Sequence, residues 1–331
     1  MRDKIIKFTK DTRIISAASA VGKKEFEGAI GDCFDLHDDS DSFGQKTWEK
    51  AESEMQRLAL NLALSKINAK EEEIDALFAG DLLNQCVGSA YGLLDFDIPY
   101  FGLYGACSTA AEGITLAAMG VSAGHFERAA AVTSSHNSSA ERQYRMPIEY
   151  GSQRAPTAQW TVTGAGAFLI GKEKGAMITE AMPGIVVDKG IKDAANMGAA
   201  MAPAVISTLS RYFAASGSEP SDFDLILTGD LGYEGSSILR DLMMTEGYDL
   251  AKRQNDCGIL IYDRERQDMH SGGSGCGCSA VVLASYILPK VERGEIRDML
   301  FVGTGAMMSP SSIQQGQSIP AIAHLVRICS Q

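Results

Sequence analysis

The sequence predicts an α/β protein built from two similar halves, each made of β-α-β units. Two internal similarities predict this fold class. Residues 72–82 (EEIDALFAGDL) and 221–231 (SDFDLILTGDL) both place an acidic residue before an apolar run that ends in Gly-Asp-Leu. Residues 105–110 (GACSTA) and 276–280 (CGCSA) are each followed by a helix-like stretch of small and apolar residues and then an apolar strand. The order strand, Gly/Cys turn, helix, strand therefore occurs twice, which favours duplication and a largely parallel sheet.

The two similarities make Asp81 equivalent to Asp230, and Cys107 equivalent to Cys278. The second copy is longer between its two motifs, so it carries an insertion there. The halves are predicted to meet near residues 175–195, where glycine and proline give turn signals.

We assign residues 1–175 to an N-terminal half, which carries the Cys107 turn and a loop over 136–160, and residues 176–331 to a C-terminal half. The 136–160 segment is polar and contains two prolines and a glycine. A loop of this length inside a compact fold is usually functional.

Strands are predicted where apolar runs of strand length lie between turn residues. In chain order they cover 12–18, 74–80, 99–103, 129–134, 164–171, 178–187, 223–229, 258–262, 298–303 and 321–328. Helices are predicted where small and apolar residues continue for longer than a strand. They cover 46–66, 107–123, 196–215, 235–246 and 278–293.

Composition and charge exclude several classes of function. The 331 residues include 30 Lys and Arg against 42 Asp and Glu, a net charge of −12, and the basic residues form no long run. This argues against binding to a nucleic-acid backbone and against a polybasic grip on anionic lipid. No apolar stretch reaches about 18 residues, so no transmembrane segment is predicted. The start of the chain loosely resembles a short signal peptide, but we interpret 14–21 as a first buried strand.

The seven cysteines are scattered, which indicates a reducing compartment and mostly buried thiols. Cys276 and Cys278 form the one close pair, and no second pair at zinc spacing accompanies it. The sequence therefore predicts no metal site in the protein itself.

Cys107 is the residue whose surroundings point most clearly to chemistry. A strand runs into a tight glycine turn and then into a helix of small residues. A thiol at the start of a helix lies near the positive end of the helix dipole, which favours the thiolate, and the amides there can hold a carbonyl oxygen or a carboxylate. The alternative is a small thiol buried under the helix.

The Cys107 segment, GACSTAAEGITLAA, resembles the nucleophile turn of the thiolase superfamily, which includes the ketoacyl synthases. The strand RAAAVTSS that follows and TGAGAFLI at 163–170 also resemble strands of that superfamily. The resemblance implies two similar halves in a five-layer α-β-α-β-α arrangement. Within the superfamily, the chain resembles the stage V sporulation protein AD family of spore-forming bacteria. The strings that carry this closer resemblance include AGDLLNQ (79–85), FGLYGACST (101–109), TSSHNSSAERQYR (133–145), LILTGDLG (225–232) and GGSGCGCSAVV (272–282).

This family resemblance implies a sporulation protein that binds dipicolinic acid, pyridine-2,6-dicarboxylate, for uptake into the developing spore. It implies other stage V sporulation A membrane proteins as partners, and a peripheral location at the spore inner membrane. Superfamily members usually form dimers through the strand that leads into the cysteine turn, so a homodimer is expected with Pro99–Tyr104 at or near its interface.

Departures from the enzymes of the superfamily predict a non-catalytic protein. Condensing enzymes pair their cysteine with His/His or His/Asn, and this chain offers Asp230 at one of those places. The other place is a Gly/Ser segment, with His270 two residues before Gly272, and Phe301 stands near where biosynthetic thiolases carry a second cysteine. A cysteine nucleophile needs a base and an orienting group. The alternative hypothesis is a thiolase-like or ketoacyl-synthase-like acyltransferase with Cys107 as nucleophile.

The predicted ligand site combines the strand ends, the Cys107 turn and the 136–160 loop. Its candidate residues are Asp81, Cys107, Ser108, His136, Asn137, Arg142, Gln153, Asp230, Gly273 and His324.

Each of these roles has a structural alternative. His136 and Asn137 could cap the loop, and Arg142 could pair with nearby glutamates of a solvated loop. His324 could be a satisfied core residue.

Asp81 and Asp230 together would repel a dicarboxylate. That conflict is removed if one is protonated, if each accepts backbone N–H groups, or if calcium bridges them to the ligand. No cofactor is expected apart from calcium that would accompany the ligand.

Overall fold

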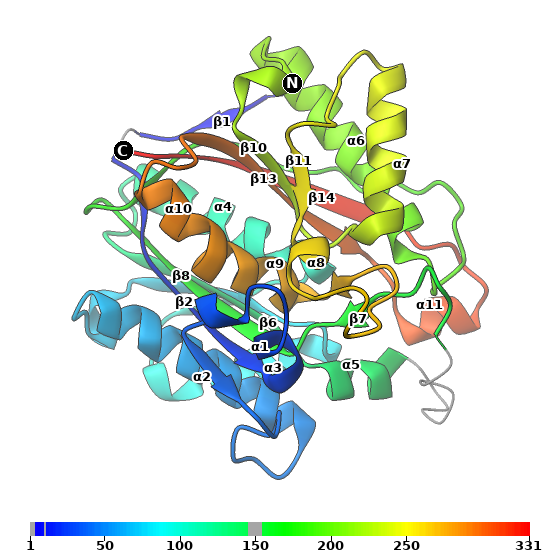
Figure 1. The fold of residues 1–331 in the computed structure, drawn as a ribbon. Coiled ribbons are helices and arrows are strands. Elements are labelled where there is room, and N and C mark those ends of the chain that lie inside the picture. Colours follow the sequence, from blue (N-terminus) through cyan, green and yellow to red (C-terminus); the bar gives the residue numbers. More distant parts are fainter. Residues whose placement is uncertain (1–3, 10, 145–153) are drawn as a thin grey trace.

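The computed structural model describes residues 4–9, 11–144 and 154–331. Strands and helices alternate along the chain and pack in layers (Figure 1). The strands are β1 (Ile6–Lys7), β2 (Arg13–Gly22), β3 (Leu36–Asp38), β4 (Ala76–Gly80), β5 (Tyr100–Gly102), β6 (Ala129–Ser135), β7 (Trp160–Thr161), β8 (Gly164–Gly171), β9 (Ala176–Met182), β10 (Leu225–Thr228), β11 (Gln254–Asp256), β12 (Gly273–Ser274), β13 (Asp298–Ala306) and β14 (Ala321–Cys329). The α-helices are α1 (Lys23–Phe26), α2 (Trp48–Lys66), α3 (Val87–Gly92), α4 (Thr109–Ser122), α5 (Asn137–Tyr144), α6 (Met197–Ser216), α7 (Gly232–Thr245), α8 (Cys257–Leu260), α9 (Cys276–Val282), α10 (Leu288–Glu292) and α11 (Pro310–Gln314).

The sheet repeats one arrangement on either side of its middle. Its order is β11-β10-β13-β14-β9-β2-β8-β6-β4-β5. β4 is parallel to β5 and β6, and β10 is parallel to β11 and β13. β8 then runs antiparallel to β6, as β14 does to β13. Each half of the sheet thus has the same five-strand pattern, with β4 matching β10 and β6 matching β13.

Two residue pairs, Arg13 with Met177 and Ile14 with Ala176, join the halves of the sheet through β2 and β9. Beyond this junction the two halves spread apart, and α4, α9 and α10 lie between them (Figure 1). β9 begins at Ala176, where the sequence analysis placed its boundary between halves. The division itself stays a prediction.

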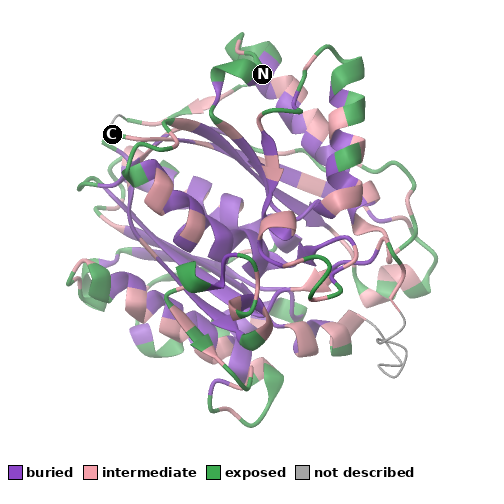
Figure 2. Cartoon of the chain, viewed as in Figure 1, coloured by how far each residue is buried: buried purple, intermediate pink, exposed green. Residues whose placement is uncertain are grey.

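Three buried apolar clusters hold the layers together. One lies between the half-sheets around α4 and α9 and includes Ile114 and Val281. A second joins α6 to the C-terminal half-sheet through residues such as Tyr212 and Leu300, and a third joins α2 to the N-terminal half-sheet through Leu60. The buried residues follow these layers in Figure 2. The five-layer α-β-α-β-α arrangement of the sequence analysis is confirmed.

Two predicted elements are wrong. The apolar run 258–262 was expected as a strand, but α8 covers Cys257–Leu260, and the preceding residues form β11. The Asp256 side chain accepts a hydrogen bond from the Ile259 N–H at 3.3 Å and so caps the helix. The loop expected over 136–160 contains α5 at its start.

Among the described residues, no helix combines the length and apolarity needed to cross a membrane.

Candidate functional site

The Cys107 turn connects β5 to α4 and is tightly constrained. A 3₁₀ turn covers Ala106–Ser108, and Ala106 has a left-handed φ of 49°, which is uncommon for a residue other than glycine. The Ser108 hydroxyl donates to the Gly105 carbonyl at 2.6 Å. A Cβ at Gly305 of β13 would lie 2.3 Å from that same carbonyl, so only glycine fits there. The turn is therefore fixed against the strand of the other half, and Cys107 is buried.

Asp230, just after β10, faces the thiol of Cys107. Its carboxylate accepts hydrogen bonds from the Ser274 hydroxyl at 2.7 Å and the Gly275 N–H at 2.9 Å, and also from the Thr304 hydroxyl. The Cys107 thiol lies next to this carboxylate. Burial raises the pKa of Asp230, while these donors act in the opposite direction.

The thiol of Cys107 is held in its protonated form. Burial raises its pKa well above the ordinary value, and the neighbouring Asp230 carboxylate and Cys276 raise it further. The Cys276 thiol donates to the Ala106 carbonyl at 2.9 Å, and burial raises its pKa as well. This environment is the opposite of the electropositive surroundings that activate a cysteine nucleophile.

A cavity of about 70 Å³ reaches the Cys107 turn. Among the described residues, its lining contains no Lys, Arg or His. The lining residues are Leu82, Tyr104, Cys107, Ala140, Glu141, Tyr144, Thr161, Ala194, Met197, Ser274, Gly275, Ala306 and Met308.

The two tyrosines of the lining are hydrogen-bonded to each other and to the backbone. The Tyr144 hydroxyl donates to the Leu82 carbonyl at 2.7 Å, and the Tyr104 and Tyr144 hydroxyl oxygens are 3.0 Å apart. Because the Tyr144 hydrogen is used on Leu82, Tyr104 donates to Tyr144. Burial raises the pKa of Tyr144 to about 12 and also raises that of Tyr104, so both rings are uncharged at neutral pH.

Asp81 lies outside the lining of this cavity, and its side chain is hydrogen-bonded to nearby residues of the same segment. Its carboxylate accepts from the Leu83 N–H at 2.8 Å, and from the Ser89 N–H at 2.7 Å and hydroxyl at 2.6 Å. Burial raises its pKa. Of the three ways to remove the conflict with an anionic ligand, the structure shows backbone N–H groups donating to both Asp81 and Asp230.

Next to Asp81, the buried Glu52 of α2 accepts from the hydroxyls of Ser134 and Ser139 at 3.0 and 2.8 Å. Burial, together with the nearby Asp81 carboxylate, raises the pKa of Glu52 to about 8. The sequence analysis did not single out Glu52, because a glutamate on a polar helix face gives no sign of burial.

His136 and Asn137 stand at the junction of β6 and α5, away from the cavity lining. The His136 Nδ1 accepts from the Ser138 N–H at 3.2 Å, so the hydrogen is on Nε2, which donates to the Asp41 carbonyl at 2.9 Å. Burial lowers the pKa of His136, which keeps this neutral form. The Asn137 side chain donates to the Thr161 carbonyl at 3.3 Å. The pair closes the start of α5.

Arg142 forms an ion pair with Glu49 of α2 and stacks over the Trp48 ring at 5.3 Å. It lies outside the lining of the Cys107 cavity, and its partner differs from the loop glutamates considered in the sequence analysis. Gln153 lies outside the described residues.

Ser108, Gly273 and His324 do not line the cavity. Gly273 pairs with Trp160 in the small β12–β7 sheet, beside the lining residue Ser274. His324 of β14 accepts from the Gly184 N–H at 3.2 Å, and burial lowers its pKa to about 4. Of the nine candidates that the structure describes, Cys107 alone lines the cavity, and Asp230, Ser108 and Gly273 lie next to lining residues.

Most of the cavity wall was not predicted from the sequence. Tyr144 and Ala140 come from α5, which was expected to be loop, and Met197 and Met308 come from segments without a chemical motif. The detectable signals were the quoted strings that contain Leu82, Tyr104 and Tyr144, and the glycine-rich segment ahead of α9 that contains Ser274.

The described part of the chain contains no group of three or more His, Cys, Asp or Glu side chains able to hold a metal ion. Whether calcium accompanies a ligand stays a prediction.

Comparison with solved structures shows the fold of condensing enzymes. 3-Oxoacyl-(acyl carrier protein) synthase III from Xanthomonas oryzae is similar with a TM-score of 0.61 and 13% identity, covering 98% of this chain and 100% of that one. A variant of OleA from Xanthomonas campestris is similar with a TM-score of 0.59 and 14% identity, covering 98% and 99%. At these identities the likeness concerns the fold.

Comparison of the sequence with known proteins identifies the family. The chain is 46% identical over 310 residues to stage V sporulation protein AD of Bacillus subtilis, covering 93% of this chain and 91% of that protein. The family model for stage V sporulation protein AD matches residues 2–329. This chain therefore belongs to the stage V sporulation protein AD family, within the thiolase-like fold.

Proposed function

We propose that this sporulation protein binds dipicolinic acid at the Cys107 cavity, for uptake into the developing spore, and that it has no condensing activity. The observation that carries the proposal is the pairing of the buried Cys107 thiol with the Asp230 carboxylate. The cavity at the cysteine turn is present, but the neighbouring Asp230 makes Cys107 a poor nucleophile.

The proposed absence of catalysis rests on the proton of the Cys107 thiol. Acyl transfer needs Cys107 to lose its proton, and a neighbouring negative charge opposes that loss. In the described lining of the cavity there is no histidine to accept the proton. Asp230 already accepts hydrogen bonds from Ser274, Gly275 and Thr304, and these donors oppose its taking a further proton.

The aromatic ring of dipicolinate suits the chemistry of the wall. The lining combines the two uncharged tyrosine rings with apolar side chains such as Leu82 and Met197. Because no basic side chain is present in the described lining, the N-terminal end of the 14-residue helix α4 is the source of positive potential for a carboxylate. Calcium that binds together with the ligand would reduce the remaining charge, and the proposal includes it.

The proposal is tested by isothermal titration of dipicolinate into the purified protein, with and without calcium. Binding at one site per chain is expected. Cys107→Ala should weaken dipicolinate binding by about three- to tenfold, because the ligand loses packing contact with the cavity wall. No loss of a catalytic nucleophile is involved. Cys33→Ala, at an exposed thiol, is the matched control and should bind like the wild type. No heat and no thermal shift with dipicolinate would overturn the proposal. Equal affinities with and without calcium would remove calcium from it.

A second measurement separates binding from acyl transfer. After incubation with acyl-CoA, intact-mass analysis is expected to show an unmodified chain. An acyl adduct that Cys107→Ala lacks, together with turnover, would replace this proposal with an acyltransferase.

Family membership is also the basis for the proposed setting of the protein. We infer that it acts at the spore inner membrane as a peripheral component, held by other stage V sporulation A membrane proteins. Co-purification of the protein with spore membranes, and its release when those proteins are deleted, would test this.

A further inference from the structure

Two acidic side chains, the buried Glu25 and the half-buried Asp41, lie close together at α1 and away from the Cys107 cavity. Glu25 is 1% exposed. Its Oε1 accepts from the Tyr262 hydroxyl and from the Thr163 N–H, the latter at 3.0 Å. Its Oε2 is buried and has no hydrogen-bond partner. Half of a fully buried carboxylate is therefore unsatisfied.

Asp41 presents a second carboxylate to the same space. A Cβ built on Gly22 would lie 2.4 Å from Asp41 Oδ1 and 2.9 Å from Glu25 Oε2. Both oxygens thus point at the small gap that the missing side chain of Gly22 leaves open. The Lys23 N–H donates to Asp41 Oδ1 at 2.7 Å, which fixes that carboxylate in place.

The nearby basic side chains are engaged elsewhere. Lys23 Nζ pairs with Glu27 at 3.8 Å, and Lys24 Nζ lies 4.4 Å from the centre of the Trp160 ring. A buried carboxylate oxygen without a donor or counter-charge costs several kcal/mol, so this gap is unfavourable unless something positive enters it.

We propose that Glu25 and Asp41 hold a hard divalent cation, Ca²⁺ or Mg²⁺, between Oε2 and Oδ1. Both ions prefer carboxylate oxygens, and Mg²⁺ is commonly bound by one or two carboxylates with water in its other positions. The Tyr262 hydroxyl and the Thr163 N–H hold Glu25 through Oε1 and leave Oε2 free to bind. The competing occupant is a proton shared by the two carboxylates, and the experiment distinguishes the two.

The site adjoins the element that walls the Cys107 cavity. The Asp41 carbonyl accepts from His136, and the Thr163 hydroxyl accepts from the Asn137 N–H at 3.1 Å, so both contact the start of α5. The cation site shares no residue with the cavity lining.

The test measures thermal unfolding of the full chain after EDTA treatment, with CaCl₂, MgCl₂ or KCl of equal ionic strength added. For the wild type, a rise of about 2–4 °C with millimolar Ca²⁺ or Mg²⁺ over KCl is expected. Glu25→Gln and Asp41→Asn should lose this rise. Asp39→Asn, which changes an exposed carboxylate two residues away, should keep it.

A direct readout guards against variants that fold poorly. Tb³⁺, which takes the same oxygen ligands as Ca²⁺, should luminesce when excited through the adjacent Tyr262, and Ca²⁺ should quench the signal by competition. Glu25→Gln should abolish the signal while its circular dichroism stays that of the wild type. A wild type that shows neither a cation-dependent rise nor Tb³⁺ luminescence would overturn the proposal. If the unfolding temperature depends on pH but not on added cations, a proton shared by Glu25 and Asp41 occupies the gap instead.

Discussion

At the scale of single residues, the central feature is a cysteine whose neighbours suppress its reactivity. From the sequence, Cys107 was expected in a tight turn ahead of a helix, and the structure shows that turn at Ala106–Ser108. That Asp230 replaces a catalytic group of the enzymes stays a prediction. The helix start was expected to favour the thiolate, whereas burial and Asp230 together raise the pKa of Cys107. Burial depth and the direction of a neighbouring side chain depend on contacts between distant segments, so neither is readable from the turn itself.

Asp230→Asn should make Cys107 more reactive. The change removes a negative charge beside the thiol and so lowers its pKa, which raises the thiolate fraction at pH 8 several-fold. Alkylation by iodoacetamide, followed residue by residue with mass spectrometry, measures the rate. The exposed Cys33 serves as internal control and should react equally in both proteins. A rate at Cys107 that is unchanged or lower in the variant would contradict this account.

Titration of Glu52 should lower the free energy of unfolding as the pH rises. Its pKa of about 8 in the folded state exceeds the ordinary 4.5, so folding takes up a proton. The contribution is complete below pH 4.5 and is lost as pH rises through about 8. Glu52→Gln should therefore unfold with a flatter pH dependence, and should gain stability on the order of 1–3 kcal/mol relative to the wild type at pH 8.

Urea unfolding at pH 5.5, 6.5 and 8 measures the effect. Glu54→Gln, on the same helix but paired with Arg57, is the control and should follow the wild type. Parallel curves for Glu52→Gln and the wild type would show that Glu52 does not titrate in this range.

At the scale of elements, the predictions succeeded where apolar pattern and length agreed. The strands and helices around both Gly-Asp and Gly/Cys motifs lie where expected, because each buries an apolar run within a layer. α8 was missed because a short apolar run does not distinguish strand from helix. The Asp256 cap was the available signal.

α5 was missed for a different reason. It buries few residues, Ser139 and Ala140 among them, and polar contacts to distant segments hold it, including Arg142 with Glu49 and Tyr144 with the Leu82 carbonyl. A helix stabilised in this way has no apolar periodicity to detect. The lining residues Ala140, Glu141 and Tyr144 were missed with this helix.

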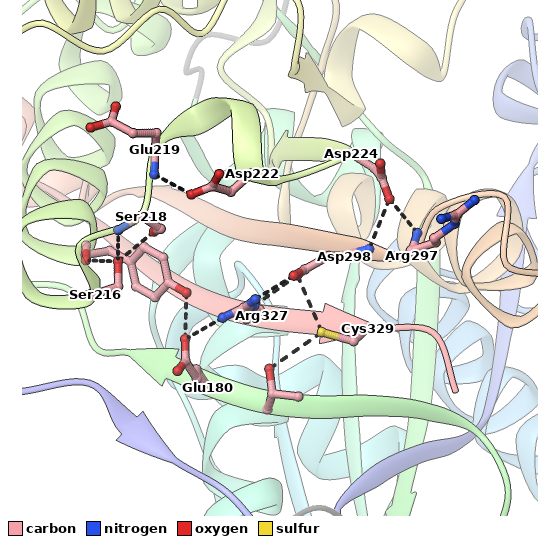
Figure 3. A network of polar contacts seen from close by, with 12 residues as sticks. Glu180, Ser216, Ser218, Glu219, Asp222, Asp224, Arg297, Asp298, Arg327 and Cys329 are labelled. Atoms are coloured by element: carbon pink, nitrogen blue, oxygen red, sulfur yellow. Dashed lines mark hydrogen bonds and ion pairs between the residues drawn. The ribbon is translucent and has the colours of Figure 1, made fainter.

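Arg327 should be the main polar link on the outer side of the C-terminal half-sheet. From β14 it pairs with Asp298 of β13 at 2.5 Å and with Glu180 of β9 at 3.2 Å, and Tyr212 of α6 donates to Glu180 at 2.6 Å (Figure 3). Arg327→Met should lower the free energy of unfolding by about 1–3 kcal/mol, because two partly buried carboxylates lose their partner.

Chemical denaturation measures this loss. Arg293→Gln breaks an exposed pair with Glu295 and should cost less than about 0.5 kcal/mol. Equal costs for the two variants would mean that the Arg327 network is no stronger than a surface ion pair.

At the scale of the whole molecule, two arrangements of five strands place the Cys107 turn of one half against β13 and Asp230 of the other. The duplication seen in the sequence thus explains why the site lies between the half-sheets.

The net charge of −12 acts against an anionic ligand. The overall field disfavours its approach, so local groups at the cavity have to supply the affinity, and raising the salt concentration should not weaken binding.

The β5 edge of the sheet should be where two copies of the chain meet. β5 ends the strand order, and its unpaired backbone groups lie beside the exposed side chains of Tyr100 and Phe101, at 40% and 49% exposure. An exposed edge strand with aromatic side chains is a template for pairing unless another surface covers it. Light scattering should therefore report a dimer for the wild type. Phe101→Asp should give a monomer with unchanged circular dichroism, because a carboxylate would be buried at the pairing surface. Val186→Asp, at a residue that is 60% exposed in the other half, should remain dimeric. A wild type that is monomeric at micromolar concentration, or a Phe101→Asp variant that still dimerises, would rule out β5 as the contact.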